Sequence, residues 1–164
     1  MPAGWEEKPD GAFTIIKTKV PSKKDRKMKA SADQPLFDQP RGHETILFVE
    51  DEESLRTVVA DFLSQLGYRI LAAAHGKEAL DLAKSYSGDI DLLLTDVIMP
   101  GMSGPQLADQ LLQARPKTKV VYVSGYAEPI LEPHGVIKSG TILLQKPFTI
   151  KVLSARLREI LEGS

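Results

Sequence analysis

The 164-residue sequence contains no cysteine, which excludes disulfide bridges, cysteine metal sites and thiol nucleophiles and is compatible with a reducing compartment. It has no excess of charge, because 21 Lys and Arg stand against 22 Asp and Glu, so bulk electrostatics gives no reason to expect a nucleic acid partner. No segment approaches the ~18 consecutive apolar residues of a membrane-spanning helix, and the start lacks the features of a signal peptide. We therefore expect a cytoplasmic protein without membrane insertion.

Residues 1–44 have few large apolar side chains, and five of the eleven prolines lie there. We expect this segment to be a largely irregular N-terminal extension or linker, with one candidate strand at 12–20. A basic run at 23–29 is typical of a solvated linker, although an acidic partner would also fit it. At ~100 to 200 residues per domain, the remaining 45–164 can form one ordinary domain.

From residue 45 onward, short apolar runs alternate with segments of helical period, the pattern of a parallel sheet covered by helices on both faces. Strands are predicted at 45–49, 68–73, 92–95, 119–123 and 141–145. Gly67 is expected to end the first helix and Thr149 to cap the last, whereas prolines and a glycine interrupt 128–139. We expect an α/β, flavodoxin-like, doubly wound sheet of five parallel strands in the order 2-1-3-4-5.

Polar side chains follow four of these strands, at the edge of the sheet where ligands bind in such folds. They are Glu50 and Asp51 after the first strand, Asp96 after the third, Ser124 after the fourth and Lys146 after the fifth. The first and third strands are neighbours in the predicted order, so the three carboxylates should meet. Two carboxylates ~4 Å apart repel by about 4 kcal/mol at an effective dielectric near 20, which calls for a cation. Their hard oxygen ligands suit Mg²⁺.

Asp96 is the natural nucleophile for phosphoryl transfer, because a carboxylate is already ionised at neutral pH and needs no base. Mg²⁺ and Lys146 would offset the charge that develops on the transferred group, and Ser124 supplies a hydroxyl donor. Each of these residues alone could be structural, but their shared position at strand ends favours a site. Glu52 and Glu53 are instead interpreted as acids that a helix N-terminus stabilises.

Four motifs in the segment 45–164 resemble the receiver domain of two-component response regulators. They are ILFVEDE (46–52), LLLTDVIMPGMSG (92–104), VVYVSGY (120–126) and LLQKPF (143–148). Together, in this order and spacing, they are highly specific for that family. The interrupted segment 128–139 resembles the receivers of hybrid sensor histidine kinases.

The resemblance implies that Asp96 accepts a phosphoryl group from a histidine kinase or a histidine phosphotransfer protein. The implied Mg²⁺ ligands are Asp51, Asp96, the backbone carbonyl of Ile98 and, through a metal-bound water, Glu50. Lys146 resembles the invariant lysine of the family and Ser124 its switch hydroxyl, and the family places a cis peptide bond before Pro147. One departure is Leu143, which stands where the family often has the Tyr or Phe of its switch.

The leading interpretation is a phosphorelay receiver with at most slow self-dephosphorylation and no classical enzyme activity. Because the chain ends soon after the last predicted helix, we expect it to signal by contact with a downstream protein, and homodimerisation stays open. The alternatives are a phosphorylation-independent interaction module, which Leu143 slightly favours, and a C-terminal fragment of a hybrid kinase. A haloacid dehalogenase-type phosphatase would need an aspartate where Ile98 stands, and a flavodoxin would need a phosphate-binding loop where the chain is acidic.

Overall fold

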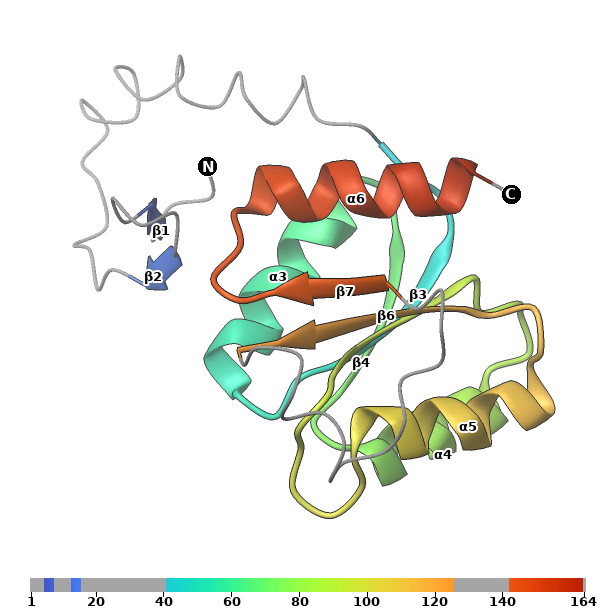
Figure 1. The fold of residues 1–164 in the computed structure, drawn as a ribbon. Coiled ribbons are helices and arrows are strands. Elements are labelled where there is room, and N and C mark those ends of the chain that lie inside the picture. The colour runs from blue at the N-terminus through green and yellow to red at the C-terminus, as the bar shows by residue number, and fades with distance from the viewer. Residues whose placement is uncertain (1–4, 8–12, 16–40, 126–141, 164) are drawn as a thin grey trace.

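The computed structural model describes residues 5–7, 13–15, 41–125 and 142–163 (Figure 1). The predicted interrupted segment 128–139 lies outside these residues. Across the described part of the chain, no helix combines the length and the apolar character needed to cross a membrane.

A small antiparallel sheet near the N-terminus pairs β1 (Trp5–Glu7) with β2 (Phe13–Ile15). The stretch 12–20, for which the sequence indicated a strand, contains β2, whereas β1 lies outside any predicted strand. The boundary of the main domain at residue 45 stays a prediction.

The main sheet has five parallel strands in the order β4-β3-β5-β6-β7. They are β3 (Thr45–Val49), β4 (Arg69–Ala73), β5 (Leu92–Asp96), β6 (Lys119–Ser124) and β7 (Ile142–Gln145). Numbered within this sheet, the order is 2-1-3-4-5, which confirms the predicted doubly wound fold. Strands β3 and β5 lie side by side near the centre, so the residues that follow them share one end of the sheet.

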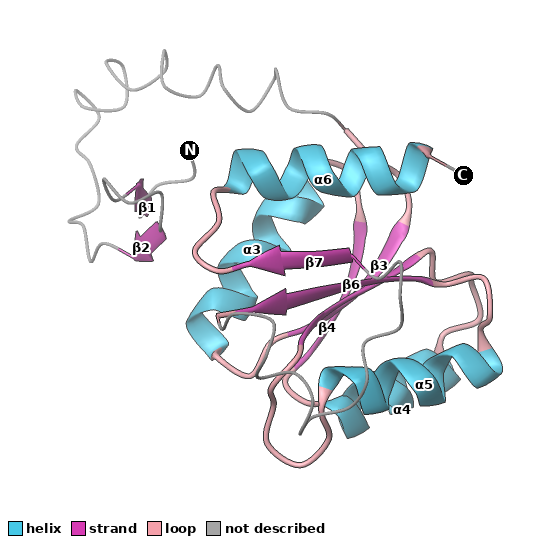
Figure 2. Ribbon diagram, in the orientation of Figure 1, coloured by secondary structure: helices cyan, strands magenta, loops and turns pink. Residues whose placement is uncertain are grey.

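Four described helices cover the two faces of the sheet. They are α3 (Glu53–Gln65), α4 (Gly76–Ser85), α5 (Gly104–Ala114) and α6 (Ile150–Glu162). Helices α3 and α6 pack on one face and α4 and α5 on the other, as Figures 1 and 2 show. The helices lie on the two faces of the sheet and not across the ends of its strands.

The alternation of side chains along the central strands divides the core into two clusters. In β3, Ile46 and Phe48 belong to the cluster under α3 and α6, whereas Leu47 and Val49 belong to the cluster under α4 and α5. All four are almost completely buried. Burial of one such side chain contributes roughly 1.5–3 kcal/mol, so the strands that carry the site are held from both sides.

Two helix ends form as the sequence predicts. The side chain of Thr149 accepts a hydrogen bond from Val152 N at 3.1 Å and caps the start of α6. Gly67 follows α3 with a φ of 103°, a conformation in which only glycine is free of strain. A Cβ at Gly67 would also lie 2.3 Å from the carbonyl oxygen of Gly42, so the chain entering β3 passes close to this turn.

A buried arginine joins the residue before β3 to α6. Both terminal nitrogens of Arg158 donate to the Glu44 carboxylate, at 2.7 and 2.8 Å, and its Nε donates to Glu162 at 2.9 Å. The Tyr68 hydroxyl lies 3.3 Å from Nη1, and the Arg158 guanidinium lies 5.9 Å from the centre of the Tyr68 ring. We call Glu44, Tyr68, Arg158 and Glu162 the Arg158 cluster. The hydrogen bond from Arg158 lowers the pKa of Glu44 to about 2, although burial opposes this shift.

We expect Glu44→Gln to lower the free energy of unfolding by about 2 kcal/mol at pH 7, because it removes a charged partner of Arg158. A folded-state pKa below the ordinary 4.5 means that the wild-type advantage is present above that value and is lost as the pH falls toward about 2. Denaturant unfolding of both proteins at pH 7, 4 and 2.5 measures the difference.

The matched control is Glu159→Gln, which removes the exposed pair between Glu159 and Arg156, with side chains 67% and 55% exposed. It should change stability by about 0.5 kcal/mol or less. A Glu44→Gln effect as small as this control at pH 7, or one that does not shrink in acid, would contradict the prediction.

Candidate functional site

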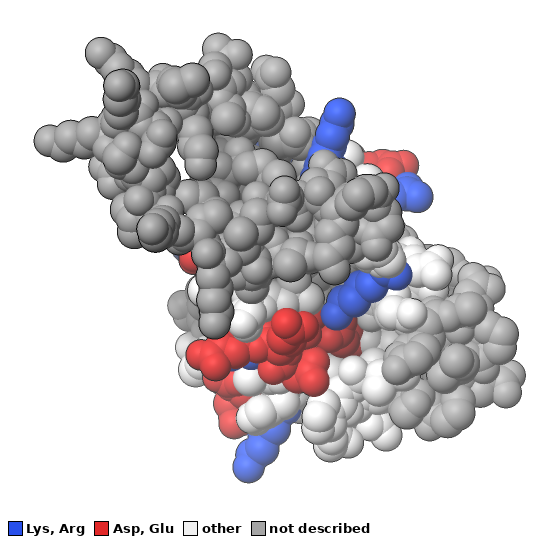
Figure 3. Space-filling model, turned by 90° about the vertical axis from the view of Figure 1, so that its left-hand side faces the viewer, with Lys and Arg blue, Asp and Glu red and all other residues white. Residues whose placement is uncertain are grey.

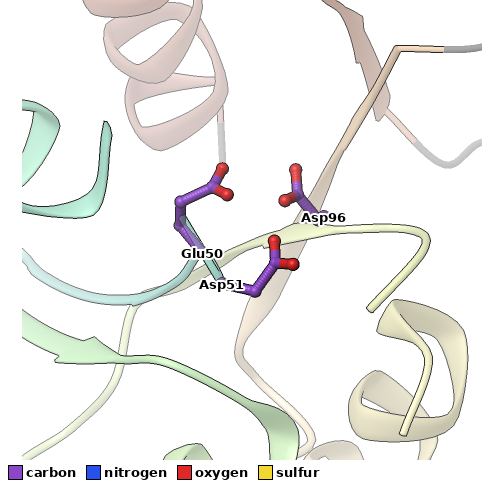
Figure 4. Close-up of side chains that lie close together, drawn as sticks. All are labelled: Glu50, Asp51 and Asp96. Carbon is purple, nitrogen blue, oxygen red and sulfur yellow. The ribbon is translucent and has the colours of Figure 1, made fainter. Parts of the chain in front are cut away.

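Three carboxylates meet where β3 and β5 end. Glu50 and Asp51 directly follow β3, Asp96 is the last residue of β5, and the register pairs Val49 with Thr95. Figure 4 shows the three carboxyl groups directed toward a common space, and one oxygen from each lies within 4.8 Å of the others. The structure thus brings together the three acids that the sequence places at neighbouring strand ends.

The ammonium group of Lys146 lies between two of these acids. Its Nζ is 3.0 Å from Glu50 Oε2 and 3.1 Å from Asp96 Oδ1. Lys146 follows β7, its backbone N–H donates to the carbonyl oxygen of Ser124 at 2.7 Å, and the bond to Pro147 is cis, as the family resemblance implied. Lys146 therefore connects the ends of β3, β5 and β6 through its side chain and its backbone.

Burial makes the charges of this site costly. Glu50 is only 3% exposed, and its burial together with the nearby charge of Asp96 raises its pKa to about 7, against the opposing effect of Lys146. Burial also raises the pKa of Asp96, which Lys146 partly offsets. Burial disfavours the charge on Lys146, but Asp96 and Glu50 outweigh it and raise the Lys146 pKa. One ammonium group does not compensate three carboxylates.

The donor set suits a small divalent cation. Carboxylate oxygens are the ligands that Mg²⁺ prefers, and the ion commonly keeps several waters and meets a phosphoryl oxygen. Unlike the two buried acids, Asp51 is exposed, so the site is open to solvent on its side. Glu52 and Glu53, which follow Asp51 in the chain, are also exposed. Figure 3 shows acidic side chains gathered on one face of the molecule. Glu50, Asp51 and Asp96 could hold a divalent ion that water and a ligand still reach.

The remaining predicted residues lie around the acids. Ser124 ends β6 and is buried, next to the β5 strand end that carries Asp96. Ile98 stands two residues after Asp96 in the turn that leaves β5. Leu143 is half-buried in β7 opposite Tyr122 of β6, and both pack in the cluster under α4 and α5. The roles implied for these residues stay predictions.

Two contacts with the backbone around Asp96 were not predicted from the sequence. The Thr95 hydroxyl donates to the carbonyl oxygen of Asp96 at 3.1 Å. Gly104, the first residue of α5, donates its N–H to Val97 O at 2.8 Å. A Cβ at Gly104 would lie 2.2 Å from Asp96 O, so only glycine lets α5 start this close to the strand end. The motif 92–104 contains Gly104, but its sequence alone does not reveal this contact.

A further residue that the sequence analysis missed is Arg56 of α3. Its Nη1 donates to the carbonyl oxygen of Glu50 at 2.8 Å. The two residues are six positions apart and belong to different elements, so no helical or strand spacing indicates the contact.

Comparison with known proteins gives a consistent result. The sequence profile described as "Response regulator receiver domain" matches residues 46–158. Sensor kinase CckA of Brucella abortus is 37% identical over 121 residues, which cover 74% of this chain and 13% of CckA. Response regulator receiver protein CpdR of the same organism is 28% identical, with 71% of this chain and 95% of CpdR covered.

Among solved structures, the receiver domain of the hybrid histidine kinase CckA matches with a TM-score of 0.56 and 40% identity. The match covers 71% of this chain and 98% of that domain. A response regulator receiver protein from Sinorhizobium medicae matches with a TM-score of 0.59 and 30% identity, covering 73% and 92% of the two chains. The chain spans 13% and 47% of the lengths of the curated relatives CckA and YrkP of Bacillus subtilis.

We expect Gly104→Ala to lower the free energy of unfolding by about 1–3 kcal/mol, because the new methyl group would collide with the backbone of Asp96. Thermal or denaturant unfolding measures the loss. The control is Gly125→Ala, where a Cβ would meet nothing within 4 Å and stability should hardly change. Equal stability of Gly104→Ala and wild type would show that α5 can move away from β5 at little cost.

Proposed function

The chain belongs to the response regulator receiver family, and on this premise we propose that it is a phosphoacceptor module in which Asp96 receives a phosphoryl group from a phosphohistidine. The observation that supports this most directly is the arrangement around Asp96. Its carboxylate ends a central strand, lies 3.1 Å from the Lys146 ammonium and shares a space with two more acids. No base is needed for such a nucleophile, because the carboxylate is ionised when its charge is compensated.

In the proposed reaction, one carboxylate oxygen of Asp96 attacks the phosphorus of the donor. The new O–P bond forms as the P–N bond to the donor imidazole breaks, and the imidazole nitrogen keeps the electron pair and takes up a proton. Lys146, 3.1 Å from Asp96, would stabilise the negative charge of the transferred group, and Ser124 would donate a hydrogen bond to one of its oxygens. Thr95 and Gly104 keep the Asp96 backbone in place.

The metal part of the proposal assigns Mg²⁺ to the same acids. Asp51, Asp96 and the Ile98 carbonyl would hold it directly, and Glu50 through a water. When bound, Mg²⁺ supplies positive charge next to the transferred group. The fit is supported by the two buried carboxylates with raised pKa values, which a divalent charge would keep ionised.

The partners follow from the same chemistry. A histidine kinase or a histidine phosphotransfer protein would supply the phosphoryl group, and a downstream protein would read the product by contact in the cytoplasm. We assign the receiver to residues 45–164 and an N-terminal extension to 1–44. The identity shared with the named sensor kinase CckA favours a second candidate, in which this chain is the receiver portion of a hybrid kinase.

The phosphoacceptor is tested by incubating the full chain with Mg²⁺ and a small phosphoramidate donor, followed by intact mass measurement. We expect a phosphoryl adduct on wild type and on Asp61→Asn, an exposed aspartate of α3, but none on Asp96→Asn. A chelator should abolish the adduct because the acids then lack their compensating charge. Equal labelling of Asp96→Asn and wild type would place the acceptor elsewhere.

The contribution of Lys146 is measured by the rate of the same reaction. We expect Lys146→Met to slow labelling about 100-fold or more, since it removes a charged donor aimed at the reacting group. Lys151→Met, which removes an exposed lysine of α6, is the matched control and should react like wild type. An unchanged rate in Lys146→Met would exclude a direct electrostatic role for its ammonium group.

A further inference from the structure

Every polar group of Glu50 has a hydrogen-bond partner, and each group has a different partner residue. Its N–H donates to Ala73 O of β4 at 3.1 Å. Its Oε1 accepts from Glu52 N at 3.1 Å, and its Oε2 accepts from Lys146 at 3.0 Å. Its carbonyl oxygen accepts from Arg56 Nη1 at 2.8 Å. Three of these contacts fix Glu50 itself, and the fourth acts on the peptide group that follows it.

The position of Asp51 depends on that peptide group. The carbonyl of Glu50 and the Cα of Asp51 belong to one planar unit, so rotation of the carbonyl moves the start of the Asp51 side chain. Asp51 is exposed and lies between β3 and α3, outside both. A donor that holds the Glu50 carbonyl therefore also directs the Asp51 carboxylate toward Asp96.

Arg56 is well placed to be this donor. It lies in the first turn of α3, where its own N–H donates to Glu52 O at 2.9 Å, and its side chain is half-buried. The helix is held by Val59, Phe62 and Leu63, which are buried in the core. We infer that Arg56 is a positioning residue that sets the Asp51 carboxylate for Mg²⁺ through the Glu50 carbonyl, an inference that rests on the proposed function.

The positive charge of Arg56 and its contact with the Glu50 carbonyl predict opposite effects on Mg²⁺ affinity, so the two roles can be distinguished. A cation close to a metal site repels the metal, so if Arg56 acted through charge alone, its removal would strengthen Mg²⁺ binding. If Arg56 acts by holding the carbonyl, its removal lets the peptide group rotate and weakens binding. Groups that orient metal ligands typically affect affinity by about 10- to 100-fold.

The experiment measures Mg²⁺ affinity of the full chain by isothermal titration calorimetry in the absence of any phosphodonor. Arg56→Met and Arg56→Gln remove the same charge. The Met and Gln side chains are similar in length to each other, but only Gln keeps an N–H donor for the carbonyl. We expect Arg56→Met to bind Mg²⁺ about tenfold more weakly than wild type and Arg56→Gln to recover part of the loss. Arg156→Met, a change at an exposed arginine of α6, should bind like wild type.

A second measurement separates positioning from loss of folding. Each variant is labelled with the phosphoramidate donor over a range of Mg²⁺ concentrations, and its unfolding midpoint is recorded. For Arg56→Met we expect a curve shifted to higher Mg²⁺ with a maximal rate near that of wild type. If that variant fails to fold, the comparison of Arg56→Gln with wild type and Arg156→Met decides in the same way, through a weaker affinity.

The outcomes distinguish the positioning role of Arg56 from the proposed function. Unchanged or tighter Mg²⁺ binding in Arg56→Met, or equal affinity of the Met and Gln variants, would overturn the positioning role and leave the proposed function standing. Wild type that binds no Mg²⁺ would overturn the metal part of the proposed function and this inference with it.

Discussion

The site depends on the contact of one ammonium group, that of Lys146, with the carboxylates of Glu50 and Asp96. These acids end two central strands whose apolar residues fill both core clusters, so the packing that stabilises the sheet also forces the two carboxylates together. Buried charges without a partner are strongly destabilising, typically by about 3–5 kcal/mol when one member of a pair is removed. Lys146 thus stabilises the fold by compensating these acids, apart from the role in phosphoryl transfer that we propose for it.

Ion pairs connect the two ends of strand β3 to the segment formed by Lys146 and helix α6. At the carboxyl end of β3, Lys146, which precedes α6, contacts Glu50. At the amino end, Arg158 of α6 contacts Glu44, just before β3. Between these two contacts, Leu153 and Leu157 of α6 are buried in the core. These two contacts and the packing between them fix the position of α6 relative to β3.

The sequence indicated the five main strands and the cluster of acids for one physical reason. Strands of a parallel sheet are buried on both faces and read as continuous apolar runs, and the strand order then decides which strand ends are neighbours. The Arg158 cluster had no such signal, since Glu44 and Arg158 are 114 positions apart and each looks like an ordinary surface charge. The contact of Gly104 with Asp96 and that of Arg56 with Glu50 likewise depend on how α5 and α3 approach the strands.

On the proposed function, a phosphoryl group on Asp96 changes the balance of charge around Lys146. The new group carries more negative charge than the carboxylate it modifies, and it lies at the same place. The Lys146 ammonium, which contacts both acids, would then be attracted more strongly toward residue 96 than before, at the expense of its contact with Glu50. Because Lys146 begins the segment that leads into α6, this competition links the chemical state of Asp96 to the position of that segment. Residue 143 in the adjoining β7 is a half-buried leucine. This charge-based link does not require an aromatic side chain at that position.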